Sequence, residues 1–269
     1  MDSLELETYG LGDIVLFGNS KRMNLSSHPG LVDVFLDNRV ENLKQCFDPN
    51  IGWETNLRSM IRLLKSMEKF TYKKKRRALF AFTYKQKFGE QREKLRLLMQ
   101  TLYTHMPKSF ISLETMKKML QALDLLRSLG ISLWHAKFKK NHVNCEDESI
   151  PAYIQAFYVR RDECLKILNS LSDTISLPKF DKRCNMRVEV GNFCLSNACL
   201  IFCTASSSVK LNIEEVSPIQ FLVIDEAAQL KECESTIPLQ LSGLRNCILI
   251  GDERQLPALV KSKVVDHCI

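Results

Sequence analysis

Two stretches near the C-terminal end of the chain place acidic residues directly after short apolar runs. The first reads Phe221-Leu-Val-Ile-Asp225-Glu226, and the second reads Cys247-Ile-Leu-Ile-Gly251-Asp252-Glu253-Arg254-Gln255. Such runs are typical of buried parallel strands, whose carboxyl ends form the ligand-binding edge of an α/β sheet. At that edge one carboxylate can hold Mg²⁺ while its neighbour draws a proton from an attacking water. With the Gln255 amide close to the same phosphate, these residues predict a nucleoside-triphosphate hydrolysis site.

A third apolar run, Cys199-Leu-Ile-Phe-Cys203, leads into Thr204, Ala205 and Ser206, followed by two more serines. Hydroxyls and exposed backbone amides at the end of a strand could contact a phosphate backbone. A plain serine-rich turn explains these residues almost equally well. An Asp-Glu pair alone also reads most simply as a turn or helix cap, so the prediction depends on the three elements occurring together.

The joint occurrence of the three elements resembles superfamily 1 helicases, specifically the senataxin-like and nonsense-mediated-decay-like branch, and the plant senataxin-like members most closely. The segment from Gly10 to Met23 also resembles a family segment that follows the first nucleic-acid motif. The resemblance implies an α/β fold, namely part of a RecA-like P-loop NTPase motor domain with a parallel sheet and a mainly helical insertion. It also implies ATP and Mg²⁺ as cofactors and single-stranded RNA or DNA as partner.

The same resemblance assigns roles to individual residues. Asp225 would coordinate the Mg²⁺ of ATP and Glu226 would polarise the hydrolytic water, while Gln255 would sense the γ-phosphate. Residues Thr204, Ala205 and Ser206 would lie near the sugar-phosphate backbone of the strand. The catalytic pair is thus expected to be Glu226 and Gln255, with Asp225 as the metal ligand.

The departure from the family pattern concerns the phosphate loop. These motors grip ATP with a glycine-rich loop that ends in Gly-Lys-Thr or Gly-Lys-Ser, yet no glycine of this chain is followed by lysine. We expect that loop to belong before residue 1 and the second motor domain after residue 269. Negligible ATPase and unwinding activity by the chain alone is therefore expected. The strand of the missing loop flanks the Gly251 strand in this fold, so an unpaired apolar edge and poor solubility are also expected.

Hydrophobic spacing divides the chain into three regions. A strand at Gly12–Gly18 and a helix at Leu31–Phe47 belong to residues 1–48, the first part of the motor domain. Helical spacing then runs through residues 49–182, which we predict to be the insertion, with helices at 53–67, 90–103, 112–129 and 152–171. The stripe from Met116 to Leu129 is predicted to be core. A short helix at 188–198 opens residues 183–269, the C-terminal part of the motor domain.

A basic run within the insertion reads Tyr72-Lys-Lys-Lys-Arg-Arg77 and is followed by Phe80, Phe82, Tyr84 and Phe88. The cations could grip phosphates while the aromatic rings stack on bases, or the run could be a nuclear address. A solvated helix end beside core aromatics is an equally good interpretation.

Composition adds weaker limits. The 269 residues carry a formal charge of +7, which favours polyanionic partners without requiring them. Ten cysteines without a C-x-x-C pair are typical of free thiols in a reducing compartment. The N-terminus does not resemble a signal peptide, and the longest uncharged stretch is a poor membrane span, so a nuclear or cytoplasmic protein with no membrane partner is expected.

Two further functions stay open at this point. The chain could be a non-catalytic nucleic-acid or protein binding module derived from a helicase. A metal-dependent nuclease that uses Asp225, Glu226 and Asp252 is chemically possible, but it needs a fourth ligand and a base that the sequence does not display.

Overall fold

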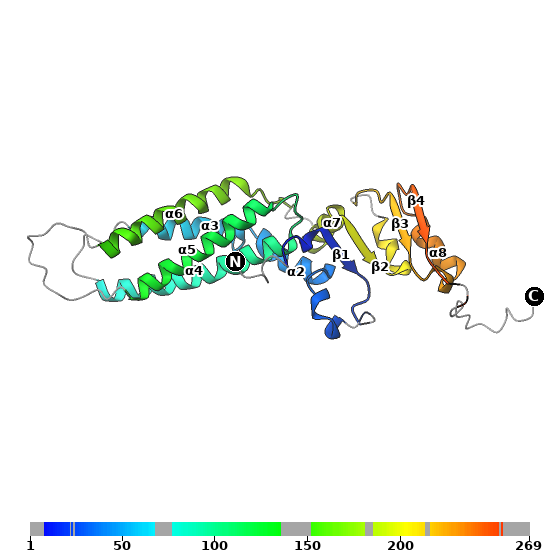
Figure 1. Cartoon of the computed structure of the whole chain (residues 1–269), viewed down its shortest axis with the longest axis horizontal. Coiled ribbons are helices and arrows are strands. Elements are labelled where there is room, and N and C mark those ends of the chain that lie inside the picture. Colours follow the sequence, from blue (N-terminus) through cyan, green and yellow to red (C-terminus); the bar gives the residue numbers. More distant parts are fainter. Residues whose placement is uncertain are drawn as a thin grey trace, which may run out of the picture. The chain divides into compact units, whose positions relative to one another are not determined.

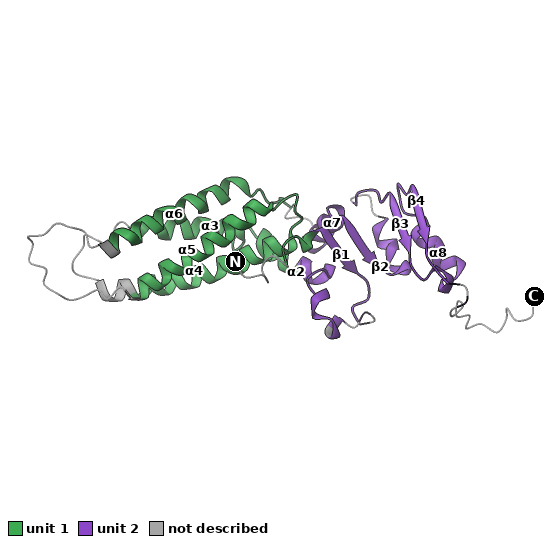
Figure 2. Cartoon of the chain, viewed as in Figure 1, with its two compact units in different colours: residues 1–12, 41–186 green, residues 13–40, 187–269 purple. Residues whose placement is uncertain are grey.

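The computed structural model describes residues 8–21, 23, 25–67, 77–135, 152–180, 185–212, 216–252 and 254. These residues form two compact units (Figure 2). Unit 1 comprises residues 1–12 and 41–186, and unit 2 comprises residues 13–40 and 187–269. Residues 72–76 of the basic run lie outside the described residues.

Unit 1 is a bundle of long helices that run side by side (Figure 1). Its helices are α3 (Trp53–Ser66), α4 (Arg77–His105), α5 (Leu113–His135) and α6 (Ala152–Thr174), together with the second part of α2 (Leu36–Phe47). Helix α4 packs on α3 and α5, and α6 packs on α5 and α3, so each long helix has two neighbours. The described residues of the predicted insertion, 49–182, are therefore mainly helical.

Apolar side chains three or four residues apart on each helix fill the centre of the bundle. The predicted stripe on α5 is confirmed as core, because Met116, Met119, Leu126 and Leu129 are fully buried. The other helices contribute fully buried residues with the same spacing, among them Met60, Leu64, Leu95, Met99, Leu102, Leu168 and Leu171. Burial of this much apolar surface is what holds four helices together in water.

Unit 2 contains two separate two-stranded parallel sheets. Strand β1 (Ile14–Phe17) pairs with β2 (Leu200–Cys203), and β3 (Phe221–Ile224) pairs with β4 (Asn246–Leu249). The remaining elements of the unit are η2 (Leu25–Ser27), η3 (Pro29–Leu31), α7 (Met186–Ser196), η5 (Ala205–Leu211), η6 (Ala227–Gln229) and α8 (Glu232–Leu239), with the single turn η1 (Leu11–Asp13) at the boundary. All four predicted strands are confirmed, and the helix predicted from Leu31 begins at Leu36.

One face of the β1–β2 sheet covers the core of unit 2. Val15 and Phe17 pack there with Leu195, Leu211 and Leu241. Arg39 of α2 is also fully buried, and its Nη2 donates a hydrogen bond of 2.5 Å to the carbonyl oxygen of Ile14. Burial lowers the pKa of this guanidinium, while Cys194, Asp13 and Asp33 act in the opposite direction. Arg39 thus ties the start of α2 to the start of β1.

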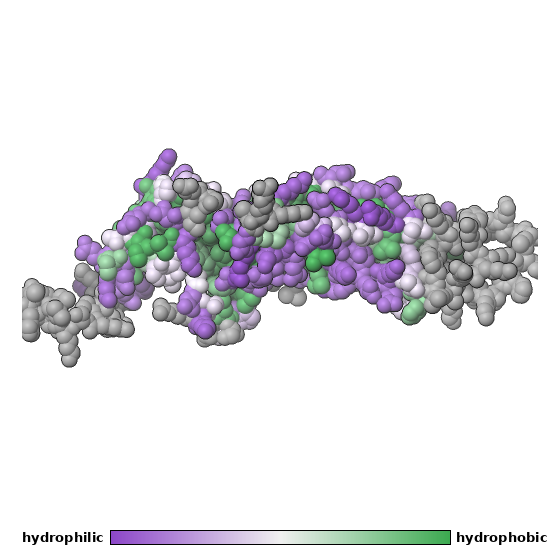
Figure 3. Space-filling model, turned by 180° about the vertical axis from the view of Figure 1, so that it is seen from behind, coloured by the Kyte–Doolittle hydropathy of each residue, from purple (hydrophilic) through white to green (hydrophobic). Residues whose placement is uncertain are grey.

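The strands that precede the acidic motifs are expected to be buried. This expectation is wrong for many of their side chains, which are exposed. Half of the side chain of Phe221 and of Val223 in β3 is exposed, and every residue of β4 is exposed. The physical reason is that side chains of a strand point to the two faces of its sheet, and the described core cluster of unit 2 includes no residue of β3 or β4. On the face shown in Figure 3, hydrophobic residues of unit 2 reach the surface, whereas much of unit 1 is hydrophilic.

Candidate functional site

The carboxylates lie at the carboxyl end of the β3–β4 sheet. The register pairs Ile224 with Leu249, and the amide of Ile250 continues the ladder by donating to the carbonyl oxygen of Ile224 at 2.9 Å. Asp225 and Glu226 follow Ile224 directly, and both are exposed to solvent. The prediction that the two acidic motifs follow neighbouring parallel strands is therefore confirmed.

The backbone of Glu226 is left-handed, with φ 53° and ψ 37°. A residue with a Cβ atom pays on the order of 1–2 kcal/mol for this conformation, so tertiary contacts must hold it. Its amide donates to Asp225 Oδ1 at 3.0 Å, and its Oε2 accepts from Gln229 Nε2 at 3.1 Å. The turn therefore holds both carboxylates before any ligand arrives.

The end of β4 closes against this turn. The amide of Ala227 donates to the carbonyl oxygen of Ile250 at 2.7 Å. A Cβ atom at Gly251 would come within 2.7 Å of the amide nitrogen of Ala228 and 3.1 Å of its Cβ. Only glycine fits there, and the close approach brings the next residue, Asp252, to the same edge of the sheet. Its Oδ1 accepts a hydrogen bond of 2.9 Å from the amide of Arg254.

Gln255 lies outside the described residues, as do Glu253, Leu256 and Pro257. The predicted contact of Gln255 with a γ-phosphate therefore stays a prediction. Gln229 ends the acidic motif that begins at Asp225, and the sequence alone assigned it no role, although its amide is the group that contacts Glu226. Its position three residues after the acid, at a spacing that allows a side-chain contact in a helical turn, was the available signal.

Two exposed carboxylates side by side suit a hard divalent cation, which prefers oxygen ligands. No group of three or more His, Cys, Asp or Glu side chains that could hold a metal ion occurs among the residues placed by the structure. A cation held here would thus need oxygens from elsewhere, such as the phosphates of a nucleotide. The residues fit the metal end of a nucleotide site, whereas the phosphate grip of a Gly-Lys pair is absent from the 269 residues.

The hydroxyl turn lies at the carboxyl end of the other sheet. Thr204 and Ser206 are exposed and Ala205 is half-buried, at the point where β2 ends and η5 begins. Thr204 Oγ1 donates to Ser207 Oγ at 2.8 Å, and the carbonyl oxygen of Thr204 accepts from the amides of Ser207 and Ser208. The serine run is therefore a short 3₁₀ helix rather than an irregular turn.

The loop after β1 reaches the same place. A Cβ atom at Gly18 would lie 3.8 Å from Ser207 Oγ, so this loop and the hydroxyl turn are neighbours. The hydroxyl turn (residues 204–208) and the turn at residues 225–229, which we call the carboxylate turn, both belong to unit 2. They follow different sheets. Asp225 and Glu226 thus follow β3, and the Gly251-Asp252 segment follows β4 at the same end of that sheet, whereas Thr204, Ala205 and Ser206 follow β2 in the other sheet.

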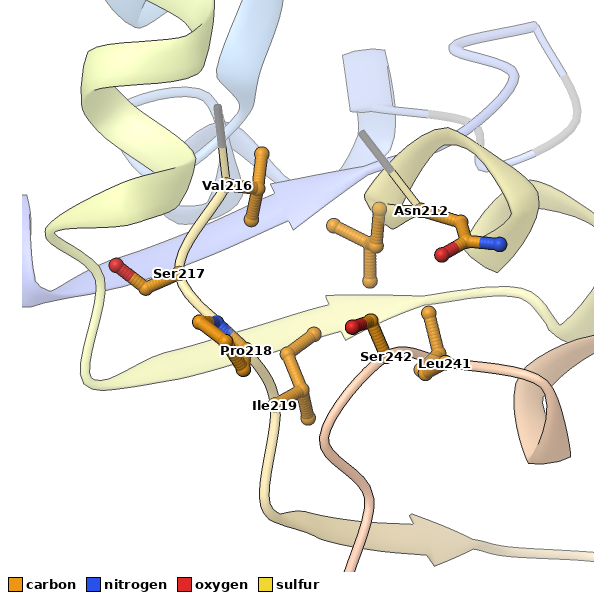
Figure 4. Close-up of a pocket in the computed structure, with 8 residues that line it drawn as sticks. Asn212, Val216, Ser217, Pro218, Ile219, Leu241 and Ser242 are labelled. Carbon is orange, nitrogen blue, oxygen red and sulfur yellow. The ribbon is translucent and has the colours of Figure 1, made fainter. Parts of the chain in front are cut away.

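A small cavity of about 190 Å³ lies elsewhere in unit 2 (Figure 4). Its walls are Leu211, Asn212, Val216, Ser217, Pro218, Ile219, Leu241 and Ser242. Ligand pockets are commonly about 300–1,000 Å³, and three of these residues belong to the buried core. The cavity is too small for a nucleotide and contains none of the predicted site residues.

None of the helices in the placed part of the chain has the length and apolar character needed to cross a bilayer. The described cysteines are free thiols. Burial raises the pKa of Cys46, Cys164 and Cys194 to about 12 and that of Cys203 to about 11, so these thiols are poor nucleophiles.

Comparison with known proteins identifies the family. A family model described as an AAA domain matches residues 13–263. A protein of Saccharomyces cerevisiae that carries the name "Putative ATP-dependent RNA helicase ECM32" is 33% identical over 78 residues, which cover 29% of this chain and 7% of that protein. Helicase sen1 of Schizosaccharomyces pombe is 52% identical over 42 residues, which cover 16% of this chain and 2% of that protein. The chain thus matches only a small part of these relatives. Because the family model spans nearly all of it, the chain belongs to the AAA domain family of P-loop NTPases.

Proposed function

We propose that the chain is part of the first motor domain of a superfamily 1 helicase of the senataxin-like and nonsense-mediated-decay-like branch, with a RecA-like core. The complete protein would couple ATP hydrolysis to the unwinding of RNA or DNA in the nucleus or cytoplasm. The parallel pairing of β3 with β4 carries this proposal, because β3 leads into Asp225 and Glu226 while β4 leads into Gly251 and Asp252 at the same end of the sheet. The family match and the names of the two yeast helicases support it.

In that motor, each acidic residue would have its own task. Asp225 would hold the Mg²⁺ that accompanies ATP, and the metal would supply charge neutralisation at the transferring phosphoryl group. Glu226 would accept a proton from the attacking water, with its carboxylate oriented by Gln229. Gln255 would sense the γ-phosphate.

The hydroxyl turn would serve the nucleic acid. Thr204 and Ser206 present exposed hydroxyls beside the start of η5, and such groups can contact the backbone of a strand without reading its sequence. We propose single-stranded RNA or DNA as the partner at Thr204, Ala205 and Ser206.

One observation favours a second candidate, a non-catalytic binding module derived from a helicase. The 269 residues contain no Gly-Lys pair, and an isolated Asp225 would hold Mg²⁺ weakly, since the metal is normally shared with phosphates and a phosphate-loop hydroxyl. We therefore propose that the chain alone has negligible ATPase activity.

The test compares ATP binding and hydrolysis by this chain with those of a longer version joined to any in-frame Gly-Lys-Thr or Gly-Lys-Ser segment encoded upstream. The longer version should hydrolyse ATP, and Glu226→Gln should lower its kcat by about 10²–10⁴-fold while ATP binding persists. Glu232→Gln, at an exposed position in the first turn of α8, is the matched control and should leave kcat unchanged.

Two results would count against these proposals. Mg²⁺-dependent turnover by the 269-residue chain that disappears with Glu226→Gln would overturn its proposed inactivity. Absence of any such upstream segment, together with salt-sensitive strand binding, would favour the binding module over the motor.

A further inference from the structure

A serine on the surface of unit 2 stands directly before a proline. Of the eight prolines in the sequence, Pro218 is the only one that follows a serine or a threonine, so Ser217-Pro218 occurs once in the 269 residues. Both residues are exposed, and residues 217–220 belong to neither a helix nor a strand. Steric contact with a proline keeps the backbone of the preceding residue extended. The hydroxyl of Ser217 therefore lies on an accessible, extended segment.

One hydrogen bond joins this hydroxyl to α7. Ser217 Oγ donates to the carbonyl oxygen of Ser196, the last residue of α7, at 3.3 Å. The last four carbonyls of a helix have no donor within the helix, so a hydroxyl from another segment can satisfy one of them. Figure 4 shows the hydroxyl of Ser217 pointing away from the middle of the cavity. Because hydrogen bonds from hydroxyl groups are commonly shorter than about 3.0 Å, this long bond is easily released.

Both partners of this hydrogen bond are next to residues of the core. Val216 directly precedes Ser217 and Leu195 directly precedes Ser196, and both apolar side chains belong to the buried core cluster of unit 2. After Ser217 the chain continues into β3 and then into the carboxylate turn. A change at Ser217 therefore acts where the end of α7 and the segment that leads into β3 contribute to the same core.

We propose that Ser217 is a phosphorylation site for a protein kinase that requires proline after the acceptor serine, and that phosphorylation loosens the contact with α7. In the transfer, a carboxylate of the kinase accepts the proton of the Ser217 hydroxyl. The bond between Oγ and the γ-phosphorus of ATP forms while the bond from that phosphorus to the bridging oxygen breaks, and ADP leaves. This proposal goes beyond the proposed function and does not depend on it.

Charge gives the direction of the effect on α7. A phosphoserine carries about −1.5 to −2 charges at pH 7, and its ionised oxygens accept hydrogen bonds. The phosphate dianion has no proton to donate, so the bond to the carbonyl oxygen of Ser196 is lost. The C-terminal end of a helix also carries a partial negative charge, which repels the phosphate. We expect phosphorylation to raise the equilibrium constant of unfolding about two- to fivefold, as one unfavourable charge at a helix end does.

The test of the site incubates the 269-residue chain with a mitogen-activated protein kinase and ATP, and mass spectrometry of the chain and of its peptides locates the phosphate. We expect one phosphoryl group, at Ser217. Ser217→Ala should abolish its incorporation because the acceptor is gone, and Pro218→Ala should abolish it although the acceptor remains. Ser242→Ala is the matched control, because Ser242 is also an exposed serine of unit 2 but precedes Gly243, and incorporation should be unchanged.

The test of the effect compares the phosphorylated and unphosphorylated chains by hydrogen exchange with mass spectrometry. The amides of residues 193–197 should exchange faster after phosphorylation, and urea unfolding should give the expected change in the equilibrium constant. Raising the NaCl concentration from about 0.05 to 0.5 M should reduce the difference, because salt screens charges near the surface. Ser217→Ala removes the hydrogen bond without adding charge, so it should speed exchange less than phosphorylation does.

Three results would count against the proposal. Absence of phosphate from Ser217, while the same kinase modifies a standard Ser-Pro peptide, would overturn the site. Phosphate that is still incorporated at Ser217 in Pro218→Ala would overturn the requirement for proline. Phosphate at Ser217 with unchanged or slower exchange of the amides of residues 193–197 would overturn the loosening of α7.

Discussion

Replacement of Gly251 by alanine should destabilise the carboxylate turn, and the size of the effect can be worked out from the structure. The new Cβ atom would lie 2.7 Å from the amide nitrogen of Ala228, 3.1 Å from its Cβ and 3.3 Å from the amide nitrogen of Ala227. Normal contacts between such atoms are about 3.5 Å, so backbone atoms must separate by roughly 0.8 Å. No flexible side chain can absorb this shift, because two of the three contacts are to backbone.

Several terms set the expected loss. Overpacking costs about 1–3 kcal/mol, and stretching the 2.7 Å hydrogen bond from Ala227 to Ile250 adds about 1 kcal/mol. The reduced freedom of the unfolded chain offsets about 0.4–1 kcal/mol of that loss. We therefore expect Gly251→Ala to lower the free energy of unfolding by about 1–3.6 kcal/mol.

Urea unfolding followed by circular dichroism measures this loss, and hydrogen exchange with mass spectrometry locates it. The amides from Ile224 to Gln229 should exchange faster in the variant. Gly30→Ala is the matched control in the same unit, since a Cβ atom there meets nothing within 4 Å, and it should change stability by less than about 0.5 kcal/mol. Equal stability of Gly251→Ala and wild type, with unchanged exchange at Ala227, would refute the close approach of β4 to the turn.

Three other perturbations have definite expected results. Gly89→Ala in the middle of α4, where an added Cβ atom has open space, should stabilise the bundle by about 0.5–1 kcal/mol in thermal unfolding, and a lower Tm would contradict this. Met99→Ala empties a fully buried position and should cost about 2–5 kcal/mol, read from the emission of buried Trp53 in urea; a cost below 1 kcal/mol would mean that the core there is loose. Alkaline pH should destabilise the chain, because thiols whose folded pKa is about 12 keep their protons while the unfolded chain loses its protons near pH 9. The effect arises from Cys46, Cys164 and Cys194. Their contribution to the free energy of unfolding is fully present below pH 9 and should be lost between pH 9 and 12. A urea midpoint that stays constant across that window would exclude the effect.

Hydrophobic periodicity is sufficient to predict the long helices of unit 1, because their apolar stripes are continuous over several turns. The limits of the prediction appear at helix ends. α4 begins at Arg77 rather than at residue 90, since its first turns carry aromatic residues that also fit a basic stacking segment. In the structure Tyr84 and Phe88 are buried and Phe82 is exposed, so the aromatic cluster is divided between core and surface.

The sequence does not predict helix α8, for a different reason. It spans Glu232–Leu239 and contains Pro238, and its serine and threonine have low intrinsic helix propensity. A carboxylate oxygen of Glu234 accepts from the amide of Lys231 at 3.2 Å, which satisfies one donor at the start of the helix. The spacing of Lys231 and Glu234 was the one local signal, and it is too common to be decisive.

Some features of the candidate site can be predicted from local sequence, and others depend on tertiary contacts. Apolar runs followed by acids predict β3, β4 and their parallel pairing, because strand character and sheet edge are encoded locally. The left-handed backbone of Glu226 and the close approach of Gly251 depend on how two distant segments meet, which no pattern along the chain reveals. The contact between Lys85 and Trp134 likewise joins residues that are 49 positions apart, so neither residue alone reveals it.

The exposed β4 strand has a practical consequence for handling this protein. Residues 246–250 carry no charge, and the side chains of Ile248, Leu249 and Ile250 are about half exposed, so the strand can recruit another extended segment during refolding or concentration. A lysine in place of Ile248 would act as a gatekeeper against such misassembly. Because Ile248 precedes Gly251 and makes none of the hydrogen bonds of the carboxylate turn, a solubilised variant of this kind would keep the chemistry of that turn available for study.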